Sequence, residues 1–327
     1  MYNLIKPFLF AFDPEDIHRI TFKILPHIPK KIKNFYKIED EKLNRNLFGI
    51  NFPNPIGLAA GLDKNGEVYN HLSDFGFGFI EIGTITPMKQ HGNEKPRLYR
   101  LLKDEALINR MGFNNHGVYK LIDNINKNGK NDIILGINVG KNKSTDNKNA
   151  YIDYIYCMTK LEDYADYFTI NISSPNTPNL RDLQKPKELK NLLLRISDAL
   201  IKKPVLLKVS PDINNKELED IVKSSEGLID GFVATNTTIY KNDINKKYRS
   251  YQGGLSGKPV KEASTKVIKV LNTLTDLPII GSGGIMNEYD AIEKIEAGAD
   301  LIQIYTGLIY KGPKLIKDIN KKILSNF

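Results

Sequence analysis

Cysteine is almost absent from the sequence: Cys157 is the only one in 327 residues, which excludes an internal disulfide. Its neighbours at 151–158 predict a half-buried helix thiol rather than a catalytic or redox group. No uninterrupted apolar run approaches the ~20 residues that a membrane-spanning helix needs. A signal-peptide pattern is also missing, because Pro7, Asp13 and Glu15 interrupt the first residues and no small-residue cleavage site follows them. We therefore expect a cytoplasmic protein.

The composition is that of an ordinary globular protein, with 41% hydrophobic and 26% charged residues. Barrels of about 250 residues commonly form one domain and tolerate insertions, so the length does not require two domains. The net charge of +9 raises the question of nucleic acid. The lysines are scattered among Asn and Ile, as in 241–247, and no RNA- or DNA-binding motif accompanies them. We expect no nucleic-acid partner.

Short apolar runs rich in Val and Ile alternate, from about residue 54 onward, with longer segments of helical period. Near-continuous apolar strands separated by helices predict an α/β fold with a parallel sheet covered on its outer face. Eight such units favour a closed (β/α)8 barrel, the TIM-barrel architecture, over an open sheet. The predicted strands lie at 55–58, 78–82, 133–138, 167–171, 205–209, 231–235, 278–281 and 301–305.

Polar residues and glycines cluster directly after these runs. In a barrel, all such positions fall on the C-terminal face, where active sites are assembled. A storage or scaffold barrel would not need lysines, amides and hydroxyls converging there, so the pattern predicts an enzyme. The clusters are Asp63-Lys64, Gly83-Thr84, 138–142, 173–176, Lys208, 235–237, 281–284 and 305–307.

Two segments fall outside the simple barrel, namely residues 1 to about 35 and the stretch 86–115. In the first, Asp13 is a predicted helix N-cap and Pro14 the first helical residue. Apolar pieces with flanking basic residues lie on both sides of this turn. They predict two short helices that form either an interfacial hairpin on a membrane or a helical lid over the end of the barrel. We place the extension at 1–35 and the barrel domain at 36–327.

Glycines and lysines suggest what the barrel binds. The cluster 281–284 follows the seventh strand and 305–307 the eighth, which is the usual phosphate-binding region of such barrels. The segment 253–257 adds a predicted flexible loop nearby. Lys208 lies inside an apolar strand, and an inward lysine needs an anionic or electron-rich partner such as a reduced flavin. Lys64 is suited to the ring or to a substrate carboxylate.

Several asparagines lie at or near strand ends. Amide side chains both donate and accept hydrogen bonds, which suits a cyclic, imide-like substrate. Any one of them is also a plausible turn residue, so their convergence carries the argument. They are Asn109, Asn138, Asn171, Asn176 and Asn236.

Six blocks of the sequence resemble the signature blocks of dihydroorotate dehydrogenases. They occur in the right order, and the resemblance spans essentially the whole chain, including 12–15. The soluble classes of that family carry Cys as the catalytic base and the quinone-linked class carries Ser; Ser174 fills this position. The N-terminal extension also resembles the membrane-binding device of the quinone-linked class. The blocks are 60–64, 108–115, 171–178, 234–238, 253–257 and 280–284.

The resemblance implies particular site residues and no metal ion. FMN would be held by Ala60, Gly61, Leu62, Asp63, Lys64, Thr84, Asn138, Asn171, Lys208, Thr235, Gly257, Gly284, Tyr305 and Thr306. The substrate would be held by Lys64, Asn109, Arg110, Met111, Gly112, Phe113, Asn171, Asn176, Asn236 and Thr237. Ser174 and Thr177 would be catalytic, and His18, Arg100 and Tyr305 would line the quinone route.

The resemblance also implies the reaction, which is oxidation of (S)-dihydroorotate to orotate in de novo pyrimidine (UMP) biosynthesis. Ser174 would remove a proton from C5 while a hydride passes from C6 to the flavin. A serine hydroxyl is a poor base, so a relay through Thr177 and water is expected. A membrane quinone, ubiquinone or menaquinone, would enter between the N-terminal helices. The protein would then lie peripherally on the cytoplasmic face of the inner (cell) membrane, in contact with lipids.

The sequence gives weaker support to two alternative functions. A related flavin barrel that reduces uridines in transfer RNA would suit the positive charge, but it would carry a catalytic Cys on the barrel and an RNA-binding helical domain, and neither is found in the sequence. A non-catalytic basic binding protein is the other alternative. Flavin absorbance of the purified protein would exclude it.

Overall fold

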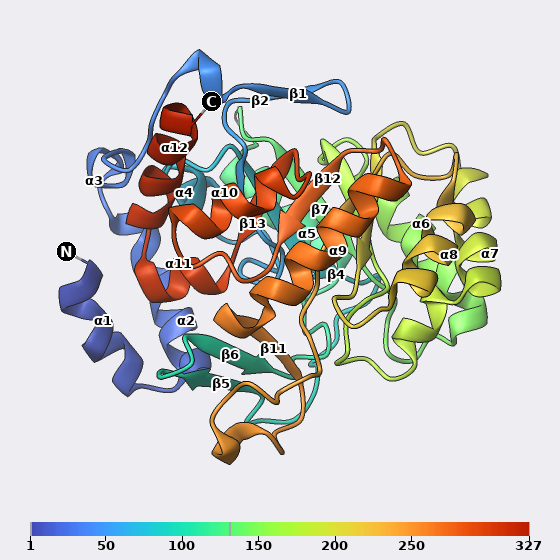
Figure 1. Cartoon of the computed structure of the whole chain (residues 1–327), viewed down its shortest axis with the longest axis horizontal. Coiled ribbons are helices and arrows are strands. Elements are labelled where there is room, and N and C mark those ends of the chain that lie inside the picture. Colours follow the sequence, from blue (N-terminus) through green and yellow to red (C-terminus); the bar gives the residue numbers. More distant parts are fainter. Residues whose placement is uncertain (1, 131, 327) are drawn as a thin grey trace.

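The centre of the molecule is a closed barrel of eight parallel strands (Figure 1). The structure is a computed structural model that describes residues 2–130 and 132–326, so Met1, Asn131 and Phe327 lie outside the described residues. Each predicted strand overlaps one barrel strand, which confirms the predicted fold. The barrel strands are β3 (Ile56–Leu58), β4 (Phe79–Ile85), β7 (Leu135–Val139), β8 (Tyr167–Asn171), β9 (Val205–Val209), β10 (Gly231–Ala234), β12 (Ile279–Ser282) and β13 (Leu301–Ile304).

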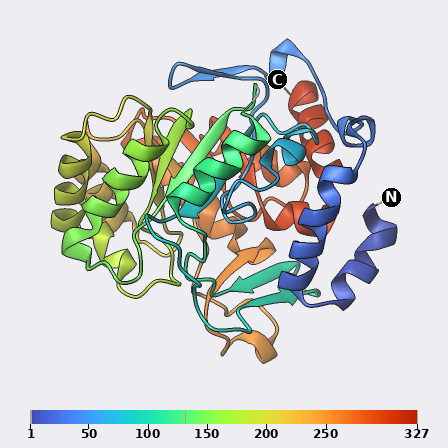
Figure 2. The ribbon, with the colours of Figure 1, turned by 180° about the vertical axis from the view of Figure 1, so that it is seen from behind.

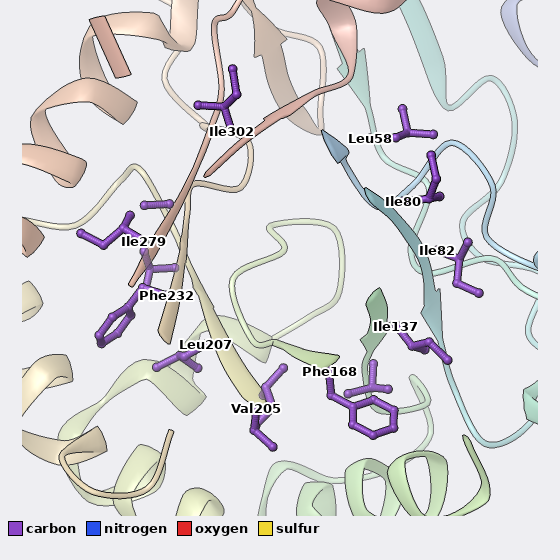
Figure 3. Packing of buried hydrophobic residues seen from close by; sticks show 14 of the residues in the cluster. Leu58, Ile80, Ile82, Ile137, Phe168, Val205, Leu207, Phe232, Ile279 and Ile302 are labelled. Carbon is purple, nitrogen blue, oxygen red and sulfur yellow. The ribbon is translucent and has the colours of Figure 1, made fainter. Parts of the chain in front are cut away.

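Helices surround the barrel because alternate strand residues present apolar side chains outward. Ile80 and Ile82 of β4 illustrate this, and Figure 3 shows such side chains arranged around the outside of the ring. The helices are α4 (Tyr69–Ser73), α5 (Val118–Asn128), α6 (Ala150–Leu161), α7 (Pro186–Ser197), α8 (Asn215–Ser225), α9 (Lys261–Leu274), α10 (Glu288–Glu296), α11 (Thr306–Lys311) and α12 (Lys314–Asn326). Short 3-10 turns are η1 (Leu25–His27), η2 (Glu41–Leu43), η3 (Asn147–Asn149), η4 (Leu180–Gln184), η5 (Lys246–Tyr248) and η6 (Lys258–Val260).

Cys157 corrects one prediction. It lies on α6, as expected, but it is fully buried rather than half-buried. The reason is its position one turn after Tyr154 on the helix face that packs against the barrel. Burial raises the pKa of the thiol well above its usual value, so the group stays protonated and unreactive.

The lower half of the barrel interior is apolar. Phe52 closes its N-terminal end from a hairpin of β1 (Arg45–Leu47) and β2 (Ile50–Phe52), and its ring lies 5.3 Å from that of Phe79. Glycines leave room for the large rings: a Cβ on Gly136 would lie 2.2 Å from the Tyr167 ring. Six strands contribute to this layer, through Phe79, Tyr167, Leu206, Val233, Ile280 and Leu301.

A small antiparallel sheet lies outside the barrel, in the order β11-β6-β5 (Figure 1). It consists of β5 (Leu98–Leu101), β6 (Ala106–Asn109) and β11 (Gly254–Gly257). The prediction of a flexible loop at 253–257 is thus wrong, because most of this segment is strand β11. Its glycine content serves close packing: a Cβ on Gly254 would lie 2.0 Å from Thr237 Oγ1.

The N-terminal extension forms α1 (Tyr2–Ala11), α2 (Pro14–Ile24) and α3 (Lys30–Asn34), with α1 and α2 side by side along the barrel (Figures 1 and 2). The predicted turn is confirmed, because Asp13 Oδ1 accepts hydrogen bonds from the backbone N–H of Glu15 and Asp16 at 2.9 and 3.1 Å. Among the described residues, every helix is too short or too polar to cross a membrane.

Candidate functional site

A cavity of about 970 Å³ opens at the C-terminal ends of the barrel strands and extends to α2. Thr84 of β4, Asn171 of β8, Lys208 of β9 and Gln303 of β13 form part of its wall. The loops after these strands, the outer sheet and the N-terminal helices supply the rest. The predicted convergence of polar strand-end residues on one face is therefore what the structure shows.

Most of the predicted site residues line this cavity. From the predicted cofactor set these are Ala60, Gly61, Leu62, Lys64, Thr84, Asn171, Lys208, Thr235, Gly257, Gly284, Tyr305 and Thr306. From the other sets they are Asn109, Met111, Gly112, Phe113, Asn176, Asn236, Thr237, Ser174 and His18.

Five predicted residues lie outside the cavity wall, and two of them have clear structural tasks. Asp63 accepts hydrogen bonds from the backbone N–H of Glu67 at 2.8 Å and Val68 at 2.7 Å, and burial raises its pKa to about 6. It therefore shapes the loop that carries Lys64. Arg100 donates to the Leu9 carbonyl oxygen at 3.0 Å, so it holds α1.

The other three of the five are Asn138, Arg110 and Thr177, each of which adjoins residues of the wall in sequence or through a hydrogen bond. Asn138 is fully buried, and its side chain accepts a hydrogen bond from Asn171, another residue predicted to bind the cofactor. Arg110 donates to the Gln252 side chain and the Glu94 carbonyl oxygen, each at 3.1 Å. Thr177 is buried, and its hydroxyl has no hydrogen-bond partner among the described residues.

The strand-end amides form a connected chain. Asn171 Nδ2 donates to Asn138 Oδ1 at 3.1 Å and to Thr84 Oγ1 at 3.0 Å. Asn236 Nδ2 in turn donates to Asn171 Oδ1 at 3.2 Å. A separate pair joins Asn176 Nδ2 to Asn109 Oδ1 at 2.9 Å. The amides thus orient one another before any ligand binds.

Ser174 lies in the wall, almost fully buried, and its Oγ accepts a hydrogen bond from the Asn176 backbone N–H at 3.3 Å. Its loop is fixed by Arg181, which was not singled out from the sequence. The Arg181 guanidinium donates to the Ser173 and Thr237 carbonyl oxygens, each at 2.9 Å. It also pairs with Asp212 at 2.8 Å. One side chain therefore anchors the loops after β8, β9 and β10.

Two lysines supply positive charge to the cavity. Lys208 points inward, as predicted, and its Nζ lies 3.9 Å from Glu81 Oε1. Burial lowers the pKa of Lys208, and the Glu81 charge opposes this effect. Burial also lowers the pKa of Lys64 to about 8, helped by the nearby Arg97 charge. Both groups are held in an environment that favours an anionic ligand.

The end of the cavity near α2 is lined by His18 and Phe22 together with charged residues such as Glu15. The Nε2 of His18 lies 2.8 Å from the Leu62 carbonyl oxygen, so the ring donates a hydrogen bond there, and the ring packs 4.1 Å from that of Phe22. Burial lowers the pKa of His18, which keeps the ring neutral. Tyr305 lies between this end and the barrel, where a Cβ on Gly61 would come within 3.3 Å of its ring.

Comparison with known proteins agrees with this geometry. The family model for dihydroorotate dehydrogenase matches residues 42–327. The dihydroorotate dehydrogenase (quinone) of Christiangramia forsetii is 49% identical, with 98% of each chain covered. That of Idiomarina loihiensis is 47% identical, covering 98% of this chain and 99% of its own. A crystal structure of DHODH from Eimeria tenella in complex with ferulenol superposes with a TM-score of 0.89 at 34% identity, covering 96% of this chain and 91% of that one.

Proposed function

The chain belongs to the dihydroorotate dehydrogenase family, and on this basis we propose that it oxidises (S)-dihydroorotate to orotate with FMN as cofactor and a membrane quinone as final acceptor. The family is one of flavin-dependent dehydrogenases. The single observation that carries the proposal is one cavity in which a serine, two lysines and a chain of amides converge. The reaction belongs to pyrimidine biosynthesis.

The cavity residues fit FMN. Gly257 and Gly284 have φ of +94° and +78°, and a Cβ on either would lie within 2.4 Å of the backbone of Glu105 or Lys261. These glycines are thus required by the packing of the chain itself. Because both line the cavity, no side chain at these positions keeps a phosphate from their backbone. Lys208 suits the electron-rich ring. Asn176 Oδ1 and Gln303 Oε1 are buried acceptors without a partner among the described residues, as expected where ligand N–H groups bind.

The residues of the chain have distinct tasks in this proposal. FMN, when bound, supplies hydride acceptance and electron transfer to the quinone. Ser174 takes the proton from C5 of the substrate. The buried hydroxyl of Thr177, three residues along the same loop, is available to pass that proton toward water. Lys64 and the pair Asn109–Asn176 orient the carboxylate and imide edges of the substrate.

The N-terminal residues 1–35 form the membrane- and quinone-binding extension in this proposal, and 36–327 form the catalytic barrel. Support comes from the apolar α1 surface, on which Leu4 is 84% and Phe8 66% exposed. His18 and Tyr305 line the quinone end of the cavity, and Arg100 holds α1 beside it. The protein would attach peripherally to the cytoplasmic face of the cell membrane.

The test is to purify the protein, identify the flavin that denaturation releases, and measure orotate formation with and without a ubiquinone analogue. We expect FMN, and turnover that requires the quinone. Flavin-free protein, or the same rate of turnover without quinone, would contradict the proposal.

A further inference from the structure

Glu81 is a fully buried carboxylate in the middle of β4, inside the barrel. It lies above the apolar layer and below the cavity, and it is itself not part of the cavity wall. Among residues 2–130 and 132–326, the groups that hydrogen-bond or ion-pair with it are all donors or cations. These are Gln303 Nε2 at 2.7 Å, Asn138 Nδ2 at 2.8 Å, Thr169 Oγ1 at 3.2 Å, Tyr167 OH at 3.3 Å and Lys208 Nζ at 3.9 Å.

Burying a carboxylate is costly even when it is fully hydrogen-bonded, and apolar side chains commonly fill such a space with equal or better stability. The next layer of this same barrel is apolar, so packing alone does not call for a charge here. Two of the five partners, Lys208 and Gln303, reach the cavity wall. The buried charge is explained if Glu81 orients Lys208 and Gln303 toward whatever binds in the cavity.

The chain of amides has a direction, and Glu81 stands at its end. An asparagine amide can be turned over with little change in shape, so its direction is set by its partners. Glu81 can only accept, so Asn138 presents its Nδ2 to Glu81 and its Oδ1 to Asn171. Asn171 must then donate to Asn138 and present its own Oδ1 to Asn236. Thr84 also donates to Asn138 Oδ1, at 2.5 Å.

We propose that Glu81 is a positioning residue of the flavin and substrate site, whose carboxylate fixes the direction of the chain Asn138–Asn171–Asn236 and holds the Lys208 ammonium at the cavity wall. The proposal deepens the proposed function and rests on it. Glu81 acts here together with two backbone donors, because the N–H of Ser173 donates to Asn171 Oδ1 at 3.4 Å and that of Thr237 donates to Asn236 Oδ1 at 2.8 Å. Glu81 is the group that orients Asn138 and, through it, the Nδ2 end of Asn171.

The same carboxylate balances the charge of Lys208. Burial lowers the pKa of Lys208 and the Glu81 charge raises it, so removal of that charge moves the pKa of Lys208 further down. The other titratable group facing Glu81, Tyr167 of β8, has a pKa raised far above its usual value by burial and remains neutral. Without Glu81, the site therefore carries one extra positive charge at low pH, and Lys208 loses its own charge at a lower pH than in the wild type.

Glu81→Gln tests both consequences, and Tyr167→Phe is the matched control because it removes one donor to the same carboxylate but keeps the charge. Both are measured as flavin-loaded proteins, by orotate titration of the flavin spectrum and by the flavin midpoint potential at pH 6 and pH 9. Reversal of one or two amide contacts at ~1 kcal/mol each predicts roughly 5- to 30-fold weaker orotate binding in Glu81→Gln. Its potential should exceed that of the wild type at pH 6, because an added positive charge stabilises the reduced flavin, and the difference should shrink by pH 9. Tyr167→Phe should stay within about threefold in affinity, with an unchanged potential.

Wild-type affinity and potential in Glu81→Gln, at both pH values, would overturn the proposal. If that variant does not fold or retain flavin, a neutron crystal structure of the wild-type holoenzyme decides instead. It should show Asn138 and Asn171 each donating in the direction given above; a reversed amide, or Lys208 turned away from Glu81, refutes the proposal. Absence of flavin or of orotate formation in the wild type would contradict the proposed function, whereas an active wild type with an indifferent Glu81→Gln contradicts this inference alone.

Discussion

Arg97 and Glu15 form a two-bond ion pair, with Nε–Oε1 at 2.9 Å and Nη2–Oε2 at 3.1 Å. Arg97 also donates to the carbonyl oxygens of His91 at 2.6 Å and Asn93 at 2.9 Å. The Asn93 amide reaches the Asn176 carbonyl oxygen at 3.1 Å, in the loop after β8. The pair therefore docks α2 on the loop that covers the catalytic cavity.

Replacing Arg97 with Gln should destabilise the fold by about 1–3 kcal/mol, because it leaves a largely buried carboxylate without its main partner. Burial would raise the pKa of Glu15, but the hydrogen bonds from Arg97 and Lys95 outweigh it and lower the pKa. The pair therefore stabilises the fold above the unfolded pKa and loses this effect as pH falls through the folded pKa. Urea unfolding at pH 7 measures the loss of stability in Arg97→Gln, and unfolding at acid pH measures how the contribution of the ion pair depends on pH. Lys95→Gln, which removes the more exposed partner, is the control and should cost less than ~1 kcal/mol.

The lowered pKa of Lys64 predicts an alkaline limit for substrate binding. Its pKa is lowered from 10.5 to about 8 by burial, so its charge is present below that pH and is lost as pH rises through it. The KM for dihydroorotate should then rise above pH 8, by up to ~10-fold if one charge-assisted hydrogen bond is lost. Lys64→Arg keeps its charge across this range and should remove the alkaline rise. A flat KM between pH 7 and 9.5 in the wild type would show that Lys64 does not bind the substrate carboxylate.

Ser174→Ala should retain FMN but slow flavin reduction by dihydroorotate at least ~100-fold, which is the usual scale for a catalytic base. Stopped-flow bleaching of the flavin measures it. Ser174→Cys should recover part of the rate, with a pH profile displaced toward the thiol pKa. Bleaching by the alanine variant at near wild-type speed would remove Ser174 from the mechanism.

The eight barrel strands were predictable because a strand buried on both faces is a continuous apolar run. The outer sheet was not, because β11 pairs with β6, which lies more than a hundred residues earlier, and its glycines resemble those of a loop. Lys208 was recognised as an inward charge within its own strand. Its counterpart Glu81 was missed because the meeting of β4 and β9 inside the barrel depends on strand register. Asn138, which the sequence assigned to the cofactor, is fully buried and hydrogen-bonded to Asn171.

Gly136→Ala should destabilise the barrel by about 1–3 kcal/mol or more, because the added Cβ would lie 2.2 Å from the Tyr167 ring. Thermal and urea unfolding measure this. The double variant Gly136→Ala/Tyr167→Leu should recover part of the loss, since the smaller side chain gives back the space. If the single variant unfolds like the wild type, the lower barrel layer is less tightly packed than these contacts indicate.

The exposed apolar face of α1 separates the two interpretations of the N-terminal extension, as a membrane-bound hairpin or as a lid. The double variant Leu4→Glu/Phe8→Glu changes two side chains that are 84% and 66% exposed, so the fold should be unaffected. Burial of a Leu and a Phe in lipid contributes about 2 kcal/mol each, so binding to anionic liposomes should fall at least ~100-fold. Reduction of a long-tailed quinone in liposomes should fall with it, while reduction of a short, water-soluble quinone continues. Leu194→Glu is the control, because Leu194 is 44% exposed on α7, at the far side of the barrel from α1 (Figure 1). If the α1 variant still sediments with liposomes and reduces the long-tailed quinone at full rate, α1 is only a lid and the quinone enters elsewhere.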